Sequence, residues 1–356
     1  MNFMASRTSV GTPKRILFVV VTFVIVLNLL EIGLRLMQFR YVPFIDVPSF
    51  WGRFYSGEPD GGTFYNEDPV LFWRLKTNLY NDGNPATIED LSTGPHGFRG
   101  ENYDFKVKKA ADAFRIVCVG DSSTYGDSVR DNQTFSAMLQ QRLRKRFPDR
   151  TVEVVNAGVP GYTSHQARRY VEYELLKLSP DVIVVMVGAN DYIPASGKIA
   201  DKDRPQVSVT VAQLRKMFGR LRTYQLLAAV VNPLREVMYD TEIELDSEGH
   251  ELVPMRVGRK DFVKNLKTIA TMDDRHRCRT VLMTVPHIFD EEHPLNEDTR
   301  RAAKESDAEL LDLAKRMKEI QGQGTDLYQP DGGHPSVRGH AEIATMLEEK
   351  IAGMMR

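Results

Sequence analysis

Cysteine is scarce in this sequence, and the common metal-binding motifs are missing from it. Among 356 residues only Cys118 and Cys278 are cysteines, each in or beside an apolar, strand-like run. So few cysteines exclude a framework of several disulfides, although a single bridge would be permitted in an exported compartment. We expect both thiols to pack as small hydrophobic groups. Neither a CxxC nor an HExxH spacing occurs, so the sequence gives no sign of a metal site.

An excess of charge of either sign is also missing. Lys and Arg number 47 and Asp and Glu number 48, which leaves a formal net charge of -1. Because no global field attracts polyanions, we expect no nucleic acid partner. Hydrophobic residues at 42% and charged residues at 27% exclude a wholly disordered or fibrous protein.

Acidic residues are absent from the first thirty positions of the chain. Arg7, Lys14 and Arg15 precede an apolar segment at residues 16–34. As a helix these 19 residues span about 28 Å, close to the roughly 30 Å hydrocarbon core of a bilayer. Basic residues before a membrane span favour a cytoplasmic N-terminus. We therefore predict a single-pass membrane protein, with everything after residue 37 in the periplasm or outside the cell.

Two other interpretations of this segment stay open. A cleaved signal peptide also has an apolar region, about 7 to 15 residues long. However, residues 35–45 contain no small-x-small cleavage site. A buried core helix is the third interpretation, but it would make the basic flank and the N-terminal position a coincidence. The sequence thus favours an uncleaved anchor.

Three regions follow from the composition along the chain. Residues 1–37 form a cytoplasmic stub and the membrane anchor. Residues 38–113 are rich in Gly, Pro, Asn, Asp and aromatics, which predicts a loop-rich stalk with short strands packed on the next domain. Residues 114–356 alternate apolar runs with helical segments, apart from an insertion or lid at about 195–260. Within that insertion the basic residues 215–222 and the apolar residues 226–231 predict a solvated helix with one packed face, or else docking at a membrane surface.

The alternation from residue 114 onward predicts an α/β fold. The expected strands, each a short apolar run, are residues 114–119, 151–156, 181–187, 280–286 and 325–328. The expected helices are residues 133–147, capped by Asp131 or Asn132, and residues 163–178, 261–272, 297–320 and 336–352. Strands that alternate with helices imply right-handed crossovers and a parallel sheet covered on both faces.

Polar clusters follow the ends of four of these strands. They are GDSST at 120–124, NAGVPGYTS at 156–164, GAND at 188–191 and DGGHPS at 331–336. Ligands of open parallel sheets bind outside the carboxyl ends of the strands. We therefore expect the four clusters to meet at one edge of the sheet.

These clusters contain the parts that acyl transfer needs, namely a nucleophile, a base, a group that orients the base, and oxyanion donors. Ser122 lies in a tight turn as the candidate nucleophile. His334 is the candidate base, because imidazole side chains titrate near neutral pH, and Asp331 stands three residues before it. The amides of Gly158 and Asn190, with the Ser122 backbone N–H, are candidate oxyanion donors. The neighbouring Asp121 and Asp191 are expected to be structural instead.

The four motifs resemble the sequence blocks of the SGNH subgroup of the GDSL esterase/lipase family, over about residues 114–352. This resemblance implies a flavodoxin-like three-layer α/β/α sandwich without metal or organic cofactor. The residues it implies are Ser122, Asp331 and His334 for a catalytic triad and Ser122, Gly158 and Asn190 for an oxyanion hole. Ser123 departs from the leucine of the family's namesake motif, at a position where relatives vary. GFRG at 97–100 and the membrane helix resemble, more loosely, an exported bacterial branch linked to acylation of cell-surface polysaccharide.

We accordingly expect an exported serine esterase that removes acetyl or other short acyl groups, from cell-surface carbohydrate, through an acyl-enzyme. Three alternatives stay open. An O-acyltransferase would use the same triad with a sugar hydroxyl in place of water. A lipid esterase or lysophospholipase is favoured by the membrane tether. A non-catalytic component of envelope assembly is the third, but such a protein has no need of a complete triad.

Overall fold

The computed structural model describes residues 12–39, 65–79, 92–100, 109–195, 199–204, 217–219, 221–238, 254–276, 278–287, 293–324 and 326–355. Its contacts divide the chain into two compact units, which are Met1–Ile45 with Thr210–Tyr239 and Asp46–Val209 with Asp240–Arg356. Residues 65–79, 92–100 and 109–113 of the predicted stalk therefore belong with the α/β unit. Much of the predicted stalk and, within the predicted insertion, residues 205–216 and 239–253 lie outside the described residues.

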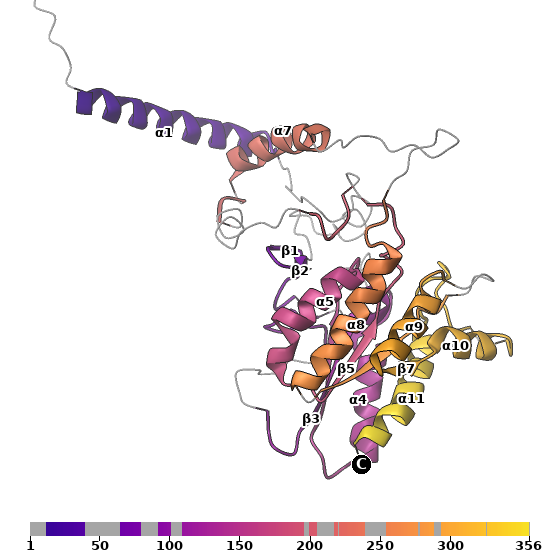
Figure 1. Ribbon diagram of the computed structural model, residues 1–356. Helices are drawn as coiled ribbons and strands as arrows, with labels where there is room; N and C mark the ends of the chain where they lie inside the picture. The colour runs from indigo at the N-terminus through magenta and orange to yellow at the C-terminus, as the bar shows by residue number, and fades with distance from the viewer. Residues whose placement is uncertain are drawn as a thin grey trace, which may run out of the picture. The chain divides into compact units, whose positions relative to one another are not determined.

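Five parallel strands form the main sheet of the larger unit (Figure 1). They are β3 (Phe114–Gly120), β4 (Val152–Gly158), β5 (Val182–Met186), β6 (Arg279–Met283) and β7 (Glu309–Leu311). Their order is β4-β3-β5-β6-β7, which is the order of flavodoxin-like folds. In such sheets the chain reverses its winding direction between β3 and β5, so a ligand is expected at the carboxyl ends of these two strands.

Helices cover both faces of the sheet, as predicted for a three-layer sandwich (Figure 1). The longer ones are α4 (Phe135–Arg146), α5 (Ser164–Tyr173), α8 (Arg259–His276), α9 (Asn296–Ser306), α10 (Leu313–Gln321) and α11 (Val337–Met354). α4, α10 and α11 share one apolar core with alternate residues of β3, among them Ile116 and Cys118. α5 packs on α8 and α8 on α9 over the other face. Both cysteines are buried and neither forms a disulfide, which confirms that they pack as small hydrophobic groups.

Two predicted helix boundaries are wrong. α4 begins at Phe135, and its N-cap is Thr134, whose hydroxyl accepts a bond from the Ala137 amide at 3.3 Å. The predicted cap, Asp131 or Asn132, is therefore wrong: neither residue is the N-cap, and the Asp131 carboxylate accepts from the Arg99 guanidinium at 2.9 Å instead. α5 ends at Tyr173 and gives way to a 3₁₀ turn, Leu175–Leu178.

The last predicted strand is wrong as well. The expected helix at 297–320 is divided into α9 and α10, and β7 between them is the fifth strand of the sheet. Asp307 adopts a left-handed conformation with φ 53° and ends α9. In the described part of the predicted strand, residues 326–328, Tyr328 forms an isolated bridge with Pro335 and no strand is present. The Glu- and Leu-rich sequence of β7 has helical propensity, and pairing with β6 overrides it.

A short hairpin, β1 (Tyr65–Asp68) and β2 (Phe72–Leu75), packs on the loop after β4. The buried Trp73 indole donates to the Pro160 carbonyl at 3.2 Å. In return, the Tyr162 hydroxyl donates to the Trp73 carbonyl at 2.6 Å. This part of the predicted stalk therefore supports one of the loops at the carboxyl edge of the sheet.

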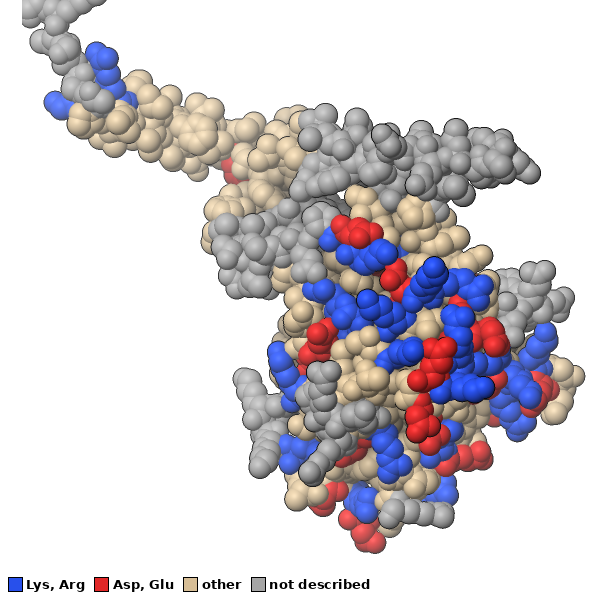
Figure 2. Space-filling model, in the orientation of Figure 1, with Lys and Arg blue, Asp and Glu red and all other residues tan. Residues whose placement is uncertain are grey.

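The smaller unit contains helices α1 (Thr12–Leu36) and α7 (Arg222–Met238). α1 includes a 24-residue segment, Pro13–Leu36, with a mean hydropathy of 2.6 and no buried residues in its most apolar window. On the face shown in Figure 2, its surface carries no charged side chain between the basic residues at its start and an acidic one near its end. The length and composition of α1 make it a candidate membrane span, and a signal sequence has the same properties.

Candidate active site

Ser122 lies two residues after the end of β3 and is the first residue of a one-turn helix, α3 (Ser122–Tyr125). Asp121 caps this helix, because its carboxylate accepts from the Ser123 amide at 3.0 Å. The residue before it must be small: a Cβ on Gly120 would lie 2.2 Å from the Met186 carbonyl oxygen. Ser122 is therefore held at the carboxyl edge of the sheet, with a backbone N–H that the helix itself leaves without a partner.

His334 joins Ser122 to Asp331. Its Nε2 lies 2.8 Å from the Ser122 Oγ, and its Nδ1 lies 2.6 Å from Asp331 Oδ2. The second oxygen of Asp331 accepts from the amides of Gly333 at 2.9 Å and His334 at 3.0 Å. Burial would raise the pKa of Asp331, but these bonds outweigh it and hold the pKa below its ordinary value. Asp331 is therefore ionised at neutral pH and suited to orient the ring.

Arg99, in the GFRG motif, clamps the turn that follows Ser122. Its buried guanidinium donates to the Tyr125 carbonyl at 2.8 Å and lies 4.3 Å from the centre of the Tyr125 ring. It also donates to the Gly126 and Val129 carbonyls and to Asp131. Reasoning about catalysis from the sequence missed Arg99, because GFRG entered it only through the looser family resemblance.

The amide of Gly158 is already occupied. It donates to Asn156 Oδ1 at 3.0 Å, so the bond predicted for an oxyanion goes to a neighbouring side chain. A Cβ at this position would lie 2.2 Å from the Tyr125 amide nitrogen. Gly158 therefore lets the turn that carries Ser122 approach β4, and this packing explains the glycine without a catalytic role.

The next glycine in the same motif, Gly161, has a backbone amide that is available to donate to an oxyanion. Tyr162 donates to the Val159 carbonyl at 3.1 Å, and Gly161 has φ 80°, as in a type II turn with Pro160 at its second position. Within the part of the chain that the structure describes, the Gly161 amide has no acceptor. The sequence signal for it was the Pro-Gly pair.

Asn190 and Asp191 follow β5, on the other side of the switch point from Ser122. The buried Asn190 uses one amide hydrogen to donate to the Tyr162 carbonyl at 3.2 Å, and the other stays available to a ligand. Asp191 accepts from the Ser164 amide at 3.0 Å and from the Ser164 hydroxyl at 2.5 Å. Asp191 thus has the structural contacts that the sequence predicts for it.

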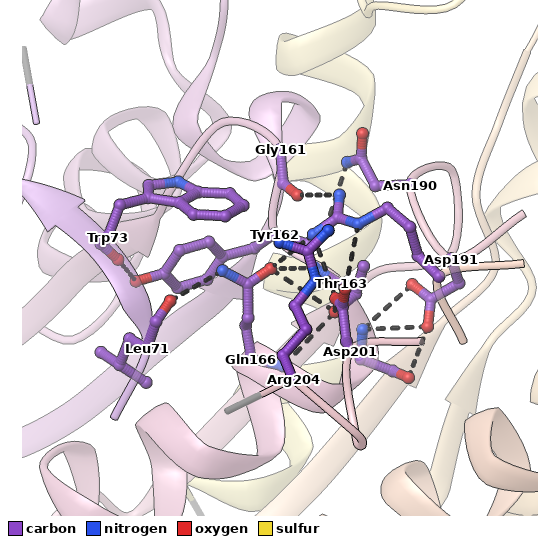
Figure 3. A network of polar contacts seen from close by, with 12 residues as sticks. Leu71, Trp73, Gly161, Tyr162, Thr163, Gln166, Asn190, Asp191, Asp201 and Arg204 are labelled. Atoms are coloured by element: carbon purple, nitrogen blue, oxygen red, sulfur yellow. Dashed lines mark hydrogen bonds and ion pairs between the residues drawn. The ribbon is translucent and has the colours of Figure 1, made fainter. Parts of the chain in front are cut away.

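A buried ion pair fixes the loop that carries Gly161. Arg256 donates to the Gly161 carbonyl at 2.7 Å and to Asp201 Oδ2 at 3.0 Å. The same carboxylate accepts from the Thr163 hydroxyl at 2.8 Å. Figure 3 shows Gly161, Thr163 and Asp201 gathered in this network. Arg256 and Asp201 lie near the two ends of the predicted insertion, and no motif in the sequence marks either of them.

The predicted site residues thus fall into two groups. The structure brings Ser122, His334 and Asp331 into one chain of hydrogen bonds, with Asn190 held in the neighbouring loop. Gly158 uses its amide in the bond to Asn156. Among the described residues, no group of three His, Cys, Asp or Glu side chains is arranged to hold a metal ion.

Residues 118–342, which include all four motifs, match the family described as GDSL-like lipase/acylhydrolase. Similar solved structures include Axe2, an acetylxylan esterase from Geobacillus stearothermophilus, with 19% identity over 67% of this chain and 94% of that one and a TM-score of 0.43. EstA, a psychrotrophic esterase from Pseudoalteromonas sp., has 16% identity over 68% and 98% of the two chains and a TM-score of 0.42. At this level of similarity neither structure bears on the substrate. A search of curated proteins found no match.

Proposed function

Because the chain belongs to the GDSL-like lipase/acylhydrolase family, we propose that it is an exported, membrane-anchored serine esterase that removes acetyl groups from carbohydrate. The coarser statement, that the protein is a hydrolase of acyl esters, follows from the family itself. One observation carries the proposed catalytic centre: His334 lies 2.8 Å from the Ser122 Oγ and 2.6 Å from Asp331 Oδ2.

In this mechanism Ser122 forms an acyl-enzyme. His334 accepts the hydroxyl proton through Nε2 while Oγ attacks the ester carbon, and Asp331 stabilises the imidazolium at Nδ1. The proton then passes from His334 to the departing alcohol oxygen. Water, deprotonated by the same imidazole, attacks the acyl-enzyme, and the release of the acid restores Ser122.

The developing oxyanion needs donors that are not already engaged. We assign this task to the backbone N–H of Ser122 and to the second amide hydrogen of Asn190. For the third donor, the free amide of Gly161 replaces Gly158 in our proposal, because Gly158 donates to Asn156. One such donor is typically worth about 3 to 4 kcal/mol of the barrier.

A short acyl group on a sugar suits the surroundings of the site. Ser122 is only 5% exposed, which favours a small acyl group at the nucleophile. Tyr192, two residues after Asn190, is 44% exposed, and its ring meets that of His293 edge-on at 6.1 Å. Burial lowers the pKa of His293 to about 4, so the His293 ring is uncharged at neutral pH. This partly exposed aromatic pair, which begins two residues after Asn190, supports a carbohydrate substrate in our proposal.

Helix α1 supports the membrane anchor in this proposal. None of its most apolar window is buried, so no protein core in the described chain accounts for it. Lys14 and Arg15 lie at its first turn, as expected for a cytoplasmic N-terminus.

The test is product analysis with the purified full-length chain in detergent. We expect release of acetate from an acetylated oligosaccharide, little release of fatty acid from lysophosphatidylcholine, and loss of both in Ser122→Ala. Fatty acid release at the higher rate would contradict the carbohydrate substrate. Transfer of the acetyl group to an added sugar, with little free acetate, would instead identify an acyltransferase.

A further inference from the structure

The apolar helix α1 is interrupted near its end by one acidic residue, Glu31. Its carboxylate accepts from the Arg222 amide at 3.0 Å and from the Thr223 amide at 2.9 Å. The Thr223 hydroxyl adds a bond at 3.1 Å, and Arg35 binds Glu31 from one turn further along α1 at 2.8 Å. Glu31 therefore caps helix α7, which lies almost two hundred residues later in the chain.

Helix α7 presents an exposed apolar stripe. Leu227, Val230 and Val231 are 61%, 56% and 38% exposed, and their spacing of three and four residues places them on one face. Met217 and Phe218, just before the helix, are also exposed. In water such a stripe is unfavourable, because each side chain retains contact with solvent that burial would remove.

The position of Glu31 along α1 gives the depth at which α7 begins. From Arg15 to Arg35 the helix rises about 30 Å, which matches the hydrocarbon core of a bilayer. Glu31 precedes Arg35 by four residues, so the start of α7 lies about 6 Å inside the outer boundary. Amphipathic interfacial helices bury their apolar face by about 5 to 10 Å. The depth set by Glu31 therefore coincides with the depth of an interfacial helix.

We propose that α7 is a membrane-interface helix, docked on the end of the anchor by Glu31, whose Leu227, Val230 and Val231 side chains contact lipid acyl chains. This inference rests on the membrane anchor in the proposed function. If Glu31 docks α7, the anchor must remain in the mature protein, because cleavage after α1 would remove the acceptor for the first amides of α7. The bilayer is the occupant that the structure favours, because the stripe belongs to the same compact unit as the candidate span.

The test measures the depth of single sites in the full-length chain in vesicles of phosphatidylethanolamine and phosphatidylglycerol. Cysteines introduced as Leu227→Cys, Val24→Cys and Tyr173→Cys are labelled with a nitroxide under native conditions, where Cys118 and Cys278 are buried. Collision with oxygen reports lipid, and collision with a water-soluble nickel complex reports solvent. We expect strong oxygen preference at position 24, intermediate preference at position 227, and nickel preference at position 173, which is exposed on the α/β unit.

Each other result overturns the inference in a distinguishable way. Nickel preference at position 227 with oxygen preference at 24 rejects the interfacial helix and leaves the anchor intact. Shielding of position 227 from both reagents indicates a protein partner. Nickel preference at 24 rejects the anchor itself, and acetate release in the same vesicles reports separately whether the esterase proposal stands.

The role of Glu31 is tested by a matched pair of substitutions in the Leu227→Cys chain. Glu31→Ala removes the acceptor for the α7 amides, so oxygen preference at position 227 should fall toward the solvent value. Leu29→Ala, at a side chain that is 64% exposed on the same helix, should leave it unchanged. Equal values in Glu31→Ala and Leu29→Ala would show that Glu31 does not dock the helix.

Discussion

Single residues of the proposed site are oriented largely by their own neighbours in the chain. Asp331 accepts from amides two and three positions later, and Asp121 accepts from the amide of Ser123. Because each of these short loops lies within one motif, the sequence reveals their chemistry. Arg99 and Arg256 act differently: each reaches a site loop from a distant stretch of chain, and no local pattern predicts such a contact.

The substitution Asp331→Asn tests whether Asp331 orients the His334 ring without contributing much to the stability of the fold. The amide cannot hold the His334 ring as a carboxylate does, so we expect kcat for ester hydrolysis to fall about a thousandfold to ten-thousandfold. The Asp331 side chain is 52% exposed, so the thermal unfolding midpoint should change little. Steady-state kinetics and a thermal melt of the same preparation check both parts, and a near-normal kcat would remove Asp331 from the mechanism.

Buried polar contacts connect the helices and loops around the proposed site. His340 in α11 accepts from the Phe135 amide at 3.2 Å and stacks on the Phe135 ring at 5.9 Å, which ties α11 to the start of α4. On the other side of the sheet edge, Arg256 and Asp201 tie the flanks of the insertion to the loop of Gly161. Helix starts and loops are therefore fixed by side chains that lie outside the four motifs.

The packing of α11 predicts a loss of stability in acid. Burial lowers the pKa of His340 to about 3 from an ordinary 6.5, with a smaller contribution from the charge of Arg99. Between these values the unfolded chain binds a proton that the folded one does not. The contribution of His340 is thus complete above pH 6.5 and is lost as pH falls toward 3, by about 1.4 kcal/mol per pH unit.

His340→Asn isolates this effect, because its amide oxygen can still accept from Phe135 but does not titrate. Denaturant unfolding at about pH 7 and about pH 5 should show a decline smaller by about 2 kcal/mol in the variant than in the original chain. Parallel declines in the two proteins would show that His340 is not the responsible group.

The Arg256–Asp201 pair predicts a coupled loss of stability and activity. Both side chains are almost fully buried, so Asp201→Asn leaves an uncompensated charge, which typically costs about 3 to 5 kcal/mol. We also expect kcat to fall at least tenfold, because the Gly161 loop loses its support. Lys202→Ala breaks the exposed pair with Asp261 in the same segment and should cost less than about 1 kcal/mol. Equal effects of the two substitutions would contradict a special role for the buried pair.

The sequence predicted β3, β4, β5 and β6 because strands buried on both faces are continuous apolar runs. Prediction from the sequence failed at β7 (Glu309–Leu311), where the helical propensity of the residues disagrees with their pairing in the sheet. It also failed at Asp131, whose carboxylate binds Arg99 and does not cap α4. For the site, residue types and their order on the sheet edge were accessible from sequence. Which backbone amide is free was not, because the bond from Gly158 to Asn156 depends on side-chain geometry.

At the scale of the whole molecule, the two compact units have different proposed functions, catalysis and attachment to the membrane. The α/β unit holds the proposed catalytic residues, and the smaller unit combines the candidate span with a helix from the middle of the chain. Capping of α7 by Glu31 gives the N-terminal helix a structural task that a discarded signal peptide would not have.

We predict that the mature protein retains its N-terminal helix and that the chain after this helix lies outside the cytoplasm. Mass spectrometry of the protein from membranes should find residues 1–37, and an alkaline wash should leave the chain in the membrane fraction. Alkaline phosphatase fused after residue 45 should be active, because this reporter enzyme folds only outside the cytoplasm. A mature N-terminus within residues 35–45 would instead identify a cleaved signal peptide.

The central claim is that Ser122 is a nucleophile activated by His334. It is tested most directly by labelling the full-length protein with a fluorophosphonate and locating the adduct by mass spectrometry. The account predicts modification of Ser122, none in Ser122→Ala and strongly reduced labelling in His334→Ala. An adduct on a different serine, or no adduct on protein that circular dichroism shows to be folded, would contradict it.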